Sequence, residues 1–175
     1  SARSAAGLLD LLGHQDISSL SLIDASTAVH VLARQRPVSA SNSKYGATAA
    51  ALMRHVEEHT VPKLTNGRTI LTLLWAVAKL QDSTGDSLKS SALECLSRKA
   101  LEMLDTCDGR GVATVAWSVV QLRKSAPSLA ENDATFAVQR GITRLLCESD
   151  HAHAFDAHSL ATIAWACGAL RCRDR

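Results

Sequence analysis

A pair of histidines with a glutamate between them gives the sequence its first hint of chemistry. In HVEEH (residues 55–59), His55 and His59 stand one helical turn apart with Glu58 beside them. In one class of metalloprotease, two histidines at this spacing hold zinc and the glutamate acts as a base. Zinc sites recruit at least a third protein ligand, and none is identifiable here. We therefore predict no metal site in this stretch, which we place on the solvated face of a helix end.

A second stretch, DHAHAFDAH at residues 150–158, is richer in potential metal ligands. These are Asp150, His151, His153, Asp156 and His158. Structural zinc usually recruits cysteine, and the five cysteines of the chain form no CxxC pair. Asp156 also has a better role as a helix cap. We predict no metal here either, and the odd number of cysteines favours a reducing compartment over a disulfide framework.

Catalytic motifs are otherwise missing from the sequence. It holds no phosphate-binding glycine loop, no nucleophile elbow and no cofactor fingerprint. We therefore expect no enzyme, no cofactor and no small-molecule substrate.

Composition restricts the class of protein further. The chain has 175 residues, of which 46% are hydrophobic and only 3% aromatic, which suits one domain of closely packed helices. A net charge of +2 permits a nucleic-acid partner without demanding one. No apolar run approaches the roughly 20 residues that cross a bilayer, so we expect a soluble protein without a membrane span.

An apolar segment built around a tryptophan occurs three times. The copies are TILTLLWAVAKL (69–80), GVATVAWSVVQL (111–122) and SLATIAWACGAL (159–170). A fourth copy, SLIDASTAVHVLARQ (21–35), has a histidine at the tryptophan position. We call these four residues the anchors: His30, Trp75, Trp117 and Trp165. A repeat period of about 45 residues is typical of stacked helical units.

Other positions recur at fixed distances from each anchor. Threonine lies three residues before every anchor, and leucine lies five residues after each tryptophan. Nine residues before the anchors come Ser21, Asn66, Asp108 and Asp156. These residue types cap helix N-termini, because a side-chain oxygen accepts a hydrogen bond from an unpaired N–H group of the first turn. Each anchor is therefore predicted to lie in a helix that begins just after its cap.

Second helices are expected between the anchor helices, at roughly 44–59, 86–105 and 132–148, where apolar residues recur at helical spacing. No alternating strand pattern is present. A helix pair of this kind cannot bury its own apolar face, so we predict an all-α solenoid of about four stacked helix-turn-helix repeats. It forms a single domain, 1–175, with units near 1–35, 36–80, 81–122 and 123–171, and we expect it to be a fragment of a longer solenoid.

Small and polar residues form a narrow strip beside the anchors on the helical wheel. Stacked helices would align these strips into a shallow groove with basic residues at its edge, which suits a single strand of RNA. The candidate RNA-binding residues are Arg34, Arg68, Thr72, Lys79, Arg110, Thr114, Ser118, Gln121, His158 and Thr162.

The strip also has a purely structural interpretation. Threonine in a helix often donates a hydrogen bond to a carbonyl one turn earlier, and small residues let helices approach closely. Arg36, Arg123 and Arg171, each six residues after an anchor, fit a helix C-terminus as well as a phosphate contact. The sequence leaves these alternatives open.

The anchor segment, above all LTLLWAVAKL at 71–80, resembles the LANxLWALAKL helix of octotricopeptide, heptatricopeptide and FAST-kinase-like repeat proteins. Those families are α-solenoids that bind organellar RNA and act in transcript stability, processing, translation or ribosome assembly. The resemblance implies a non-enzymatic RNA-binding module in an organellar ribonucleoprotein, with RNA and other proteins as partners. It favours a mitochondrion over a plastid.

The sequence departs from those families in three ways. Threonine replaces the asparagine often found three residues before the tryptophan, the first unit lacks tryptophan, and these 175 residues do not include a RAP-type domain. The chain could therefore serve as a structural subunit of a particle such as a ribosome. By the logic of one base per repeat, four units contact about four nucleotides. The alternative is a protein–protein adaptor of armadillo or HEAT type, in which the same strip holds an extended peptide.

Overall fold

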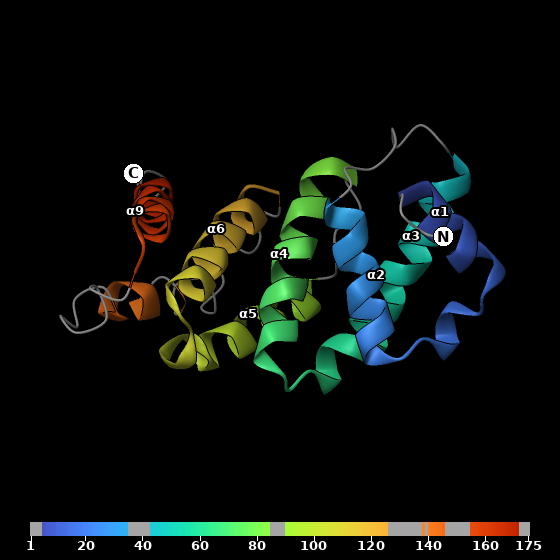
Figure 1. Cartoon of the computed structure of the whole chain (residues 1–175), viewed down its shortest axis with the longest axis horizontal. Helices are drawn as coiled ribbons and strands as arrows, with labels where there is room; N and C mark the ends of the chain where they lie inside the picture. The colour runs from blue at the N-terminus through green and yellow to red at the C-terminus, as the bar shows by residue number, and fades with distance from the viewer. Residues whose placement is uncertain are drawn as a thin grey trace.

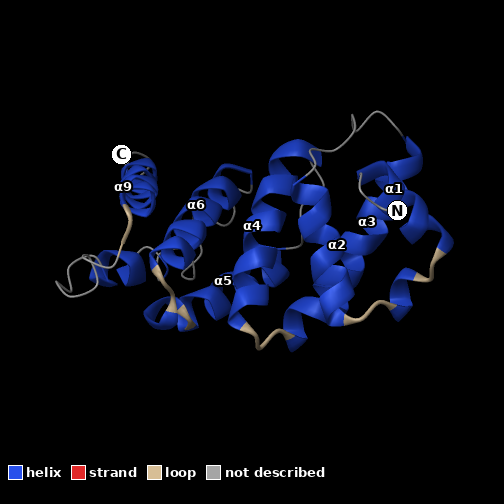
Figure 2. Ribbon diagram, in the orientation of Figure 1, coloured by secondary structure: helices blue, strands red, loops and turns tan. Residues whose placement is uncertain are grey.

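The protein is all-helical throughout the part of the chain that its computed structural model describes, residues 5–34, 43–84, 90–125, 138, 140–145 and 155–171. Figure 2 shows helices joined by loops, with no strand among these residues. The predicted all-α class is confirmed. None of the described helices combines the length and apolar character that crossing a membrane requires.

Among the described residues, seven long helices make up most of the structure. They are α1 (Ala5–His14), α2 (Leu22–Arg34), α3 (Ser43–His55), α4 (Gly67–Thr84), α5 (Ser90–Glu102), α6 (Gly109–Ser125) and α9 (Ala157–Arg171). Single helical turns lie between them, at Ile17–Ser19, Val56–Thr60, Val61–Lys63 and Leu104–Thr106. The second helices expected near 44–59 and 86–105 are α3 and α5 with the turns that follow them. Within the third, residues 138 and 140–145 are described and helical.

The four anchor helices lie side by side in chain order. Helix α2 contacts α4, α4 contacts α6 and α6 contacts α9, and Figure 1 shows them as a row across the molecule. The intervening helices support this row: α1 contacts α2 and α3, α3 contacts α2, and α5 contacts α4. Side chains on the same side of neighbouring anchor helices can therefore lie on one surface.

Each anchor helix begins where its cap residue predicts. The backbone N–H of Thr69 donates to Asn66 Oδ1 at 3.2 Å and that of Gly111 to Asp108 Oδ1 at 2.8 Å. The N–H of Ser159 likewise donates to Asp156 Oδ1 at 2.7 Å, and that of Asp24 to Ser21 Oγ at 3.2 Å. A repeated cap fixes where each helix starts, and hence which way its anchor points. The four predicted caps are confirmed.

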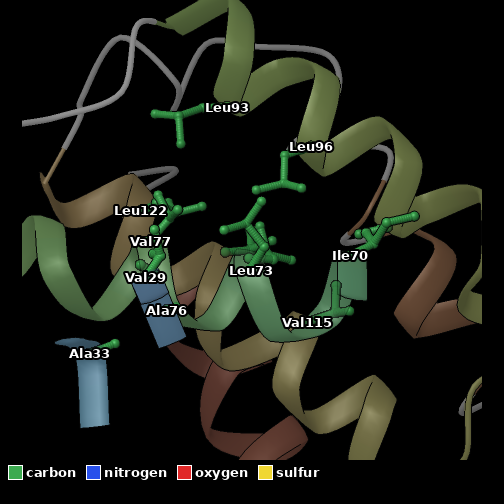
Figure 3. Close-up of a cluster of buried hydrophobic side chains, with 14 of the residues drawn as sticks. Val29, Ala33, Ile70, Leu73, Ala76, Val77, Leu93, Leu96, Val115 and Leu122 are labelled. Carbon is green, nitrogen blue, oxygen red and sulfur yellow. The ribbon is translucent and has the colours of Figure 1, made fainter. Parts of the chain in front are cut away.

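Small aliphatic side chains fill the core between the two sets of helices. In Figure 3, Leu93 and Leu96 of α5 point toward a cluster that includes Leu73 and Val77 of α4. Val29 of α2 and Leu122 of α6 belong to the same buried cluster. Because alanine, valine and leucine predominate, neighbouring helices approach closely and bring their polar margins together.

Candidate functional site

A hollow of about 540 Å³ lies where α2, α4 and α6 meet. We call it the arginine hollow. Its lining residues are His30, Arg34, Arg68, Leu71, Thr72, Trp75, Asp108, Arg110, Gly111 and Thr114. Each of the three helices contributes at least one arginine. The hollow is open to solvent on one side, so an extended ligand could lie across it.

Five of the candidate residues from the sequence meet in this hollow: Arg34, Arg68, Thr72, Arg110 and Thr114. The repeat explains why they gather. The two arginines of α4 and α6 lie seven residues before their anchors, and the two threonines lie three residues before them. Residues four apart in a helix share one face, so the packing of α4 beside α6 brings four of these side chains to one surface.

Two anchors form the aromatic wall of the hollow. The His30 and Trp75 rings meet edge to face, with centroids 5.5 Å apart and planes at 81°. Lys79 Nζ lies 4.8 Å from the centroid of the Trp75 ring, within the range of a cation–π interaction. Burial lowers the pKa of His30, and the nearby charge of Arg34 lowers it further. His30 is therefore held toward its neutral form.

Positive charge exceeds negative charge in the lining. Three arginines face a single carboxylate, Asp108, whose side chain also caps α6. Arg110 Nε lies 3.6 Å from Asp156 Oδ2, but the Arg110 side chain is 84% exposed. Such a surface ion pair contributes little, and it leaves Arg110 accessible. The hollow is thus suited to an anionic ligand that also has a flat apolar part.

Ser118 does not line a groove, and this part of the prediction is wrong. Its side chain is fully buried and donates a hydrogen bond to the Thr114 carbonyl at 2.7 Å. The equivalent residues Ala76 and Ala166 are also buried. The position just after each tryptophan therefore belongs to the helix–helix contact, where a small side chain permits close approach.

Two threonines of the strip make the hydrogen bond within their own helix that the structural interpretation predicts. Thr114 Oγ1 donates to the Arg110 carbonyl at 2.8 Å, and Thr162 Oγ1 donates to the His158 carbonyl at 2.9 Å. Their protons are used within their own helices, so they offer a ligand only the lone pairs of the hydroxyl oxygen. The chemistry of the hollow depends on its arginines more than on its threonines.

The remaining candidates lie outside the arginine hollow. Lys79 stands over Trp75, farther along α4, and the partly buried Gln121 is at the matching place on α6. His158 is exposed near the start of α9, with the partly buried Thr162 one turn later. The structure thus gathers candidates from the first three anchor helices but not from the fourth.

The tryptophan anchors differ in burial. Trp75 and Trp117 are partly buried and pack against the core, whereas Trp165 is 44% exposed. Lys124 Nζ of α6 lies 5.3 Å from the centroid of the Trp165 ring. The anchors therefore sit at the margin of the core and are not fully buried wedges. Trp165 is the most exposed of the three tryptophans.

His55 and His59, the first histidine pair, lie close together. His55 is buried, and its ring centroid lies 5.1 Å from that of the exposed His59. His151 and His153 fall outside the described residues. Within the described segments, no group of three or more histidine, cysteine, aspartate or glutamate residues is placed to hold a metal ion.

The roles of Asp108 and Arg123 were not predicted from the sequence. Asp108 was expected only as a cap, yet it also lines the arginine hollow together with Gly111, three residues later in the helix that it caps. Arg123 is buried and its Nη1 donates to the Leu170 carbonyl at 3.3 Å, which ties α6 to the C-terminal turn of α9. Arg123 therefore places its positive charge at a helix C-terminus, as the helix-dipole explanation predicts, but at the C-terminus of α9 and not of its own helix α6. Arg36 and the Arg171 side chain lie outside the described parts.

No protein-family model, no curated protein and no solved structure matches this chain. Three arginines beside an indole and an imidazole can hold a phosphate group next to a planar ring.

Proposed function

We propose that this chain is a non-enzymatic helical-repeat module that binds single-stranded or ribosomal RNA along the row α2, α4 and α6. The repeats would form a solenoid of four helix pairs, with units near 1–35, 36–80, 81–122 and 123–171. The observation that carries the proposal is the arginine hollow, to which three consecutive anchor helices each bring an arginine.

Arginine and aromatic residues together favour RNA over other anionic polymers. Guanidinium groups bind phosphate through paired hydrogen bonds. Single strands expose their bases, which stack on aromatic side chains beside a basic groove. Trp75 and His30 offer such surfaces at one wall of the hollow, while Arg68 and Arg110 lie on adjacent helices. One nucleotide per helical repeat is the spacing used in other helical-repeat proteins that bind RNA.

The cellular setting of the proposal comes from the resemblance to octotricopeptide-type repeats. It places the module in an organellar ribonucleoprotein, in a mitochondrion rather than a plastid, with a role in RNA processing, stability or ribosome assembly. A short contact on a chain of small net charge gives modest affinity. Further contacts by partner proteins of the same particle would raise the affinity for RNA.

Salt-dependent RNA binding tests the proposal. We would measure the affinity for labelled oligouridine by fluorescence anisotropy at several salt concentrations. The triple variant Arg34→Glu, Arg68→Glu, Arg110→Glu should bind more weakly and show a smaller salt slope, by about 0.7 for each phosphate that the variant no longer neutralises. The matched control reverses three exposed arginines outside the hollow, Arg54, Arg98 and Arg140, and should bind almost as the wild type does.

Two results would count against RNA. Equal loss of binding in both triple variants would mean that net charge alone is responsible, and not the hollow. Failure of the wild type to bind any single strand, combined with salt-insensitive binding of an extended peptide, would favour the adaptor function.

A further inference from the structure

The first anchor differs in kind from the other three. His30 takes the position that tryptophan holds in the later units. Its ring packs edge to face with that of Trp75, so the first two repeats keep an aromatic contact without a second indole. An imidazole is smaller than an indole, but it can accept a proton near neutral pH. The exchange therefore gives the first unit a group that can become charged.

His30 brings this group into the arginine hollow. It lines the hollow together with Arg34 and Trp75, and its side chain is partly exposed, so a ligand in the hollow can reach the ring. Arginine keeps its charge throughout the neutral range. Among the lining residues, His30 is therefore the group that a change of pH near neutrality would charge.

The charged groups around His30 come from all three helices of the hollow. They are Arg34 on α2, Arg68 and Lys79 on α4, and Asp108 and Arg110 on α6. Positive charge predominates, which disfavours a proton on the ring. Burial lowers the pKa of His30, and the charge of Arg34 lowers it further. At pH 7 the imidazole is thus neutral before a ligand binds.

A bound phosphate reverses this balance. Its negative charge offsets the arginines, so a protonated ring gains an attraction where it previously met repulsion. We infer that His30 takes up a proton when RNA binds and becomes a further cationic contact to a backbone phosphate in the arginine hollow. This inference rests on the proposed function and adds a pH dependence to it.

The affinity for RNA should therefore rise as the pH falls from 8 to 6. The pKa of His30 is below 6.5 in the free protein, and the bound phosphate raises it. Between the two pKa values the complex holds a proton that the free protein lacks, so the affinity increases by at most about tenfold for each pH unit. We expect binding at pH 6 to be about threefold tighter than at pH 7.5, or more.

Fluorescence anisotropy between pH 6 and 8 at constant salt tests this inference. The probe is labelled oligouridine without a terminal phosphate, because a terminal phosphate would itself titrate near pH 6. His30→Trp restores the residue of the other anchors, and His30→Gln keeps a polar side chain. Both variants should bind with an affinity that hardly changes over this range. His14→Gln is the matched control: it removes an exposed histidine of α1 and should keep the pH dependence of the wild type.

Calorimetry measures the proton directly. The enthalpy of RNA binding at pH 7, determined in buffers of different ionisation enthalpy, gives the number of protons taken up per complex. The wild type and His14→Gln should take up the same fraction of a proton, and both His30 variants should take up less. Circular dichroism at each pH shows whether every variant is folded, and His30→Gln still tests the inference if the larger His30→Trp side chain disturbs the packing.

The outcomes separate this inference from the proposed function. If His30 only packs on Trp75, the wild type and both His30 variants will bind RNA with the same pH dependence. That result overturns the inference and leaves RNA binding intact. An affinity that falls on acidification while the protein stays folded, or a pH dependence lost equally in His14→Gln, also overturns it. A wild type that binds no single strand at any pH overturns the proposed function as well.

Discussion

The imidazole of His30 on α2 meets the indole of Trp75 on α4 edge to face, with ring centroids 5.5 Å apart. Both residues hold the anchor position of their units, so the anchors of the first two units touch across the row. Both also line the arginine hollow. The contact between neighbouring repeats and the candidate site therefore share the same side chains.

Truncating the anchors should reveal their different burial. Complete burial of tryptophan makes its replacement by alanine cost about 3–5 kcal/mol. Because Trp75 and Trp117 are only partly buried, we expect Trp75→Ala and Trp117→Ala to lower the free energy of unfolding by about 2 kcal/mol each. Trp165→Ala should cost less than either. Urea unfolding measures these free energies. A larger loss of stability for Trp165→Ala than for Trp117→Ala would contradict the observed difference in burial.

Acid should weaken the fold through His30. Its pKa in the folded chain lies below the ordinary 6.5, chiefly because of burial and then because of Arg34. Between these two pKa values the unfolded chain binds more protons, so the free energy of unfolding falls as the pH drops below about 6.5. His30→Gln removes this contribution. Unfolding curves from pH 7.5 to 5 should converge for the wild type and the variant, and parallel pH dependences would contradict the assignment.

The repeat and its caps could be predicted because they are local features. A cap oxygen bonds an N–H three residues later, so Asn66 and Asp108 identify their helix starts without any knowledge of the neighbours. The burial of Ser118 could not be predicted in this way. A helical wheel shows that it lies next to the polar strip, but only the position of the adjacent helix shows which edge of the strip is covered.

The burial of the anchors also differs between units in a way that the repeated sequence does not indicate. Trp165 holds the same position in its unit as Trp75 and Trp117, yet it is 44% exposed whereas they are partly buried. The sequence of a repeat gives the environment of an average unit, whereas the described structure adds the environment of each individual unit.

Removing the strip threonines should leave the fold nearly intact. Thr114 and Thr162 donate to carbonyls of their own helices, and alanine is a better helix former. The triple variant Thr72→Ala, Thr114→Ala, Thr162→Ala should therefore unfold within about 0.5 kcal/mol per site of the wild type. Its RNA affinity should fall less than that of the triple arginine reversal. A thermal melt far below the wild type would show that the strip is a packing surface.

Arg123 should matter most for the attachment of α9. Arg123→Met keeps an apolar stem but removes the donor to the Leu170 carbonyl. Hydrogen bonds from charged groups contribute about 1.5–3 kcal/mol, and a loss of that size should concentrate in α9. Hydrogen exchange should show faster exchange of α9 amides with little change in α4. The exposed Arg98→Met serves as control, and uniform acceleration along the whole chain would contradict a local role.

Asp108 combines two roles that one substitution can separate. Its Oδ1 accepts a hydrogen bond from the Gly111 N–H at 2.8 Å. Its negative charge also offsets part of the positive charge of the three arginines in the hollow. Asparagine caps helices about as well as aspartate, so Asp108→Asn should leave the melting temperature almost unchanged. Because it removes a negative charge beside the proposed phosphate contacts, it should raise RNA affinity about threefold at low salt.

Asp108→Ala should give a similar gain in affinity but lose about 1 kcal/mol of stability with the cap. Glu94→Gln, an exposed charge change on α5 outside the hollow, controls for net charge. If Asp108→Asn and Glu94→Gln raise affinity equally, the RNA does not lie in the arginine hollow. If only Asp108→Asn does so, and the gain disappears at high salt as screening predicts, the carboxylate and the bound phosphates are neighbours.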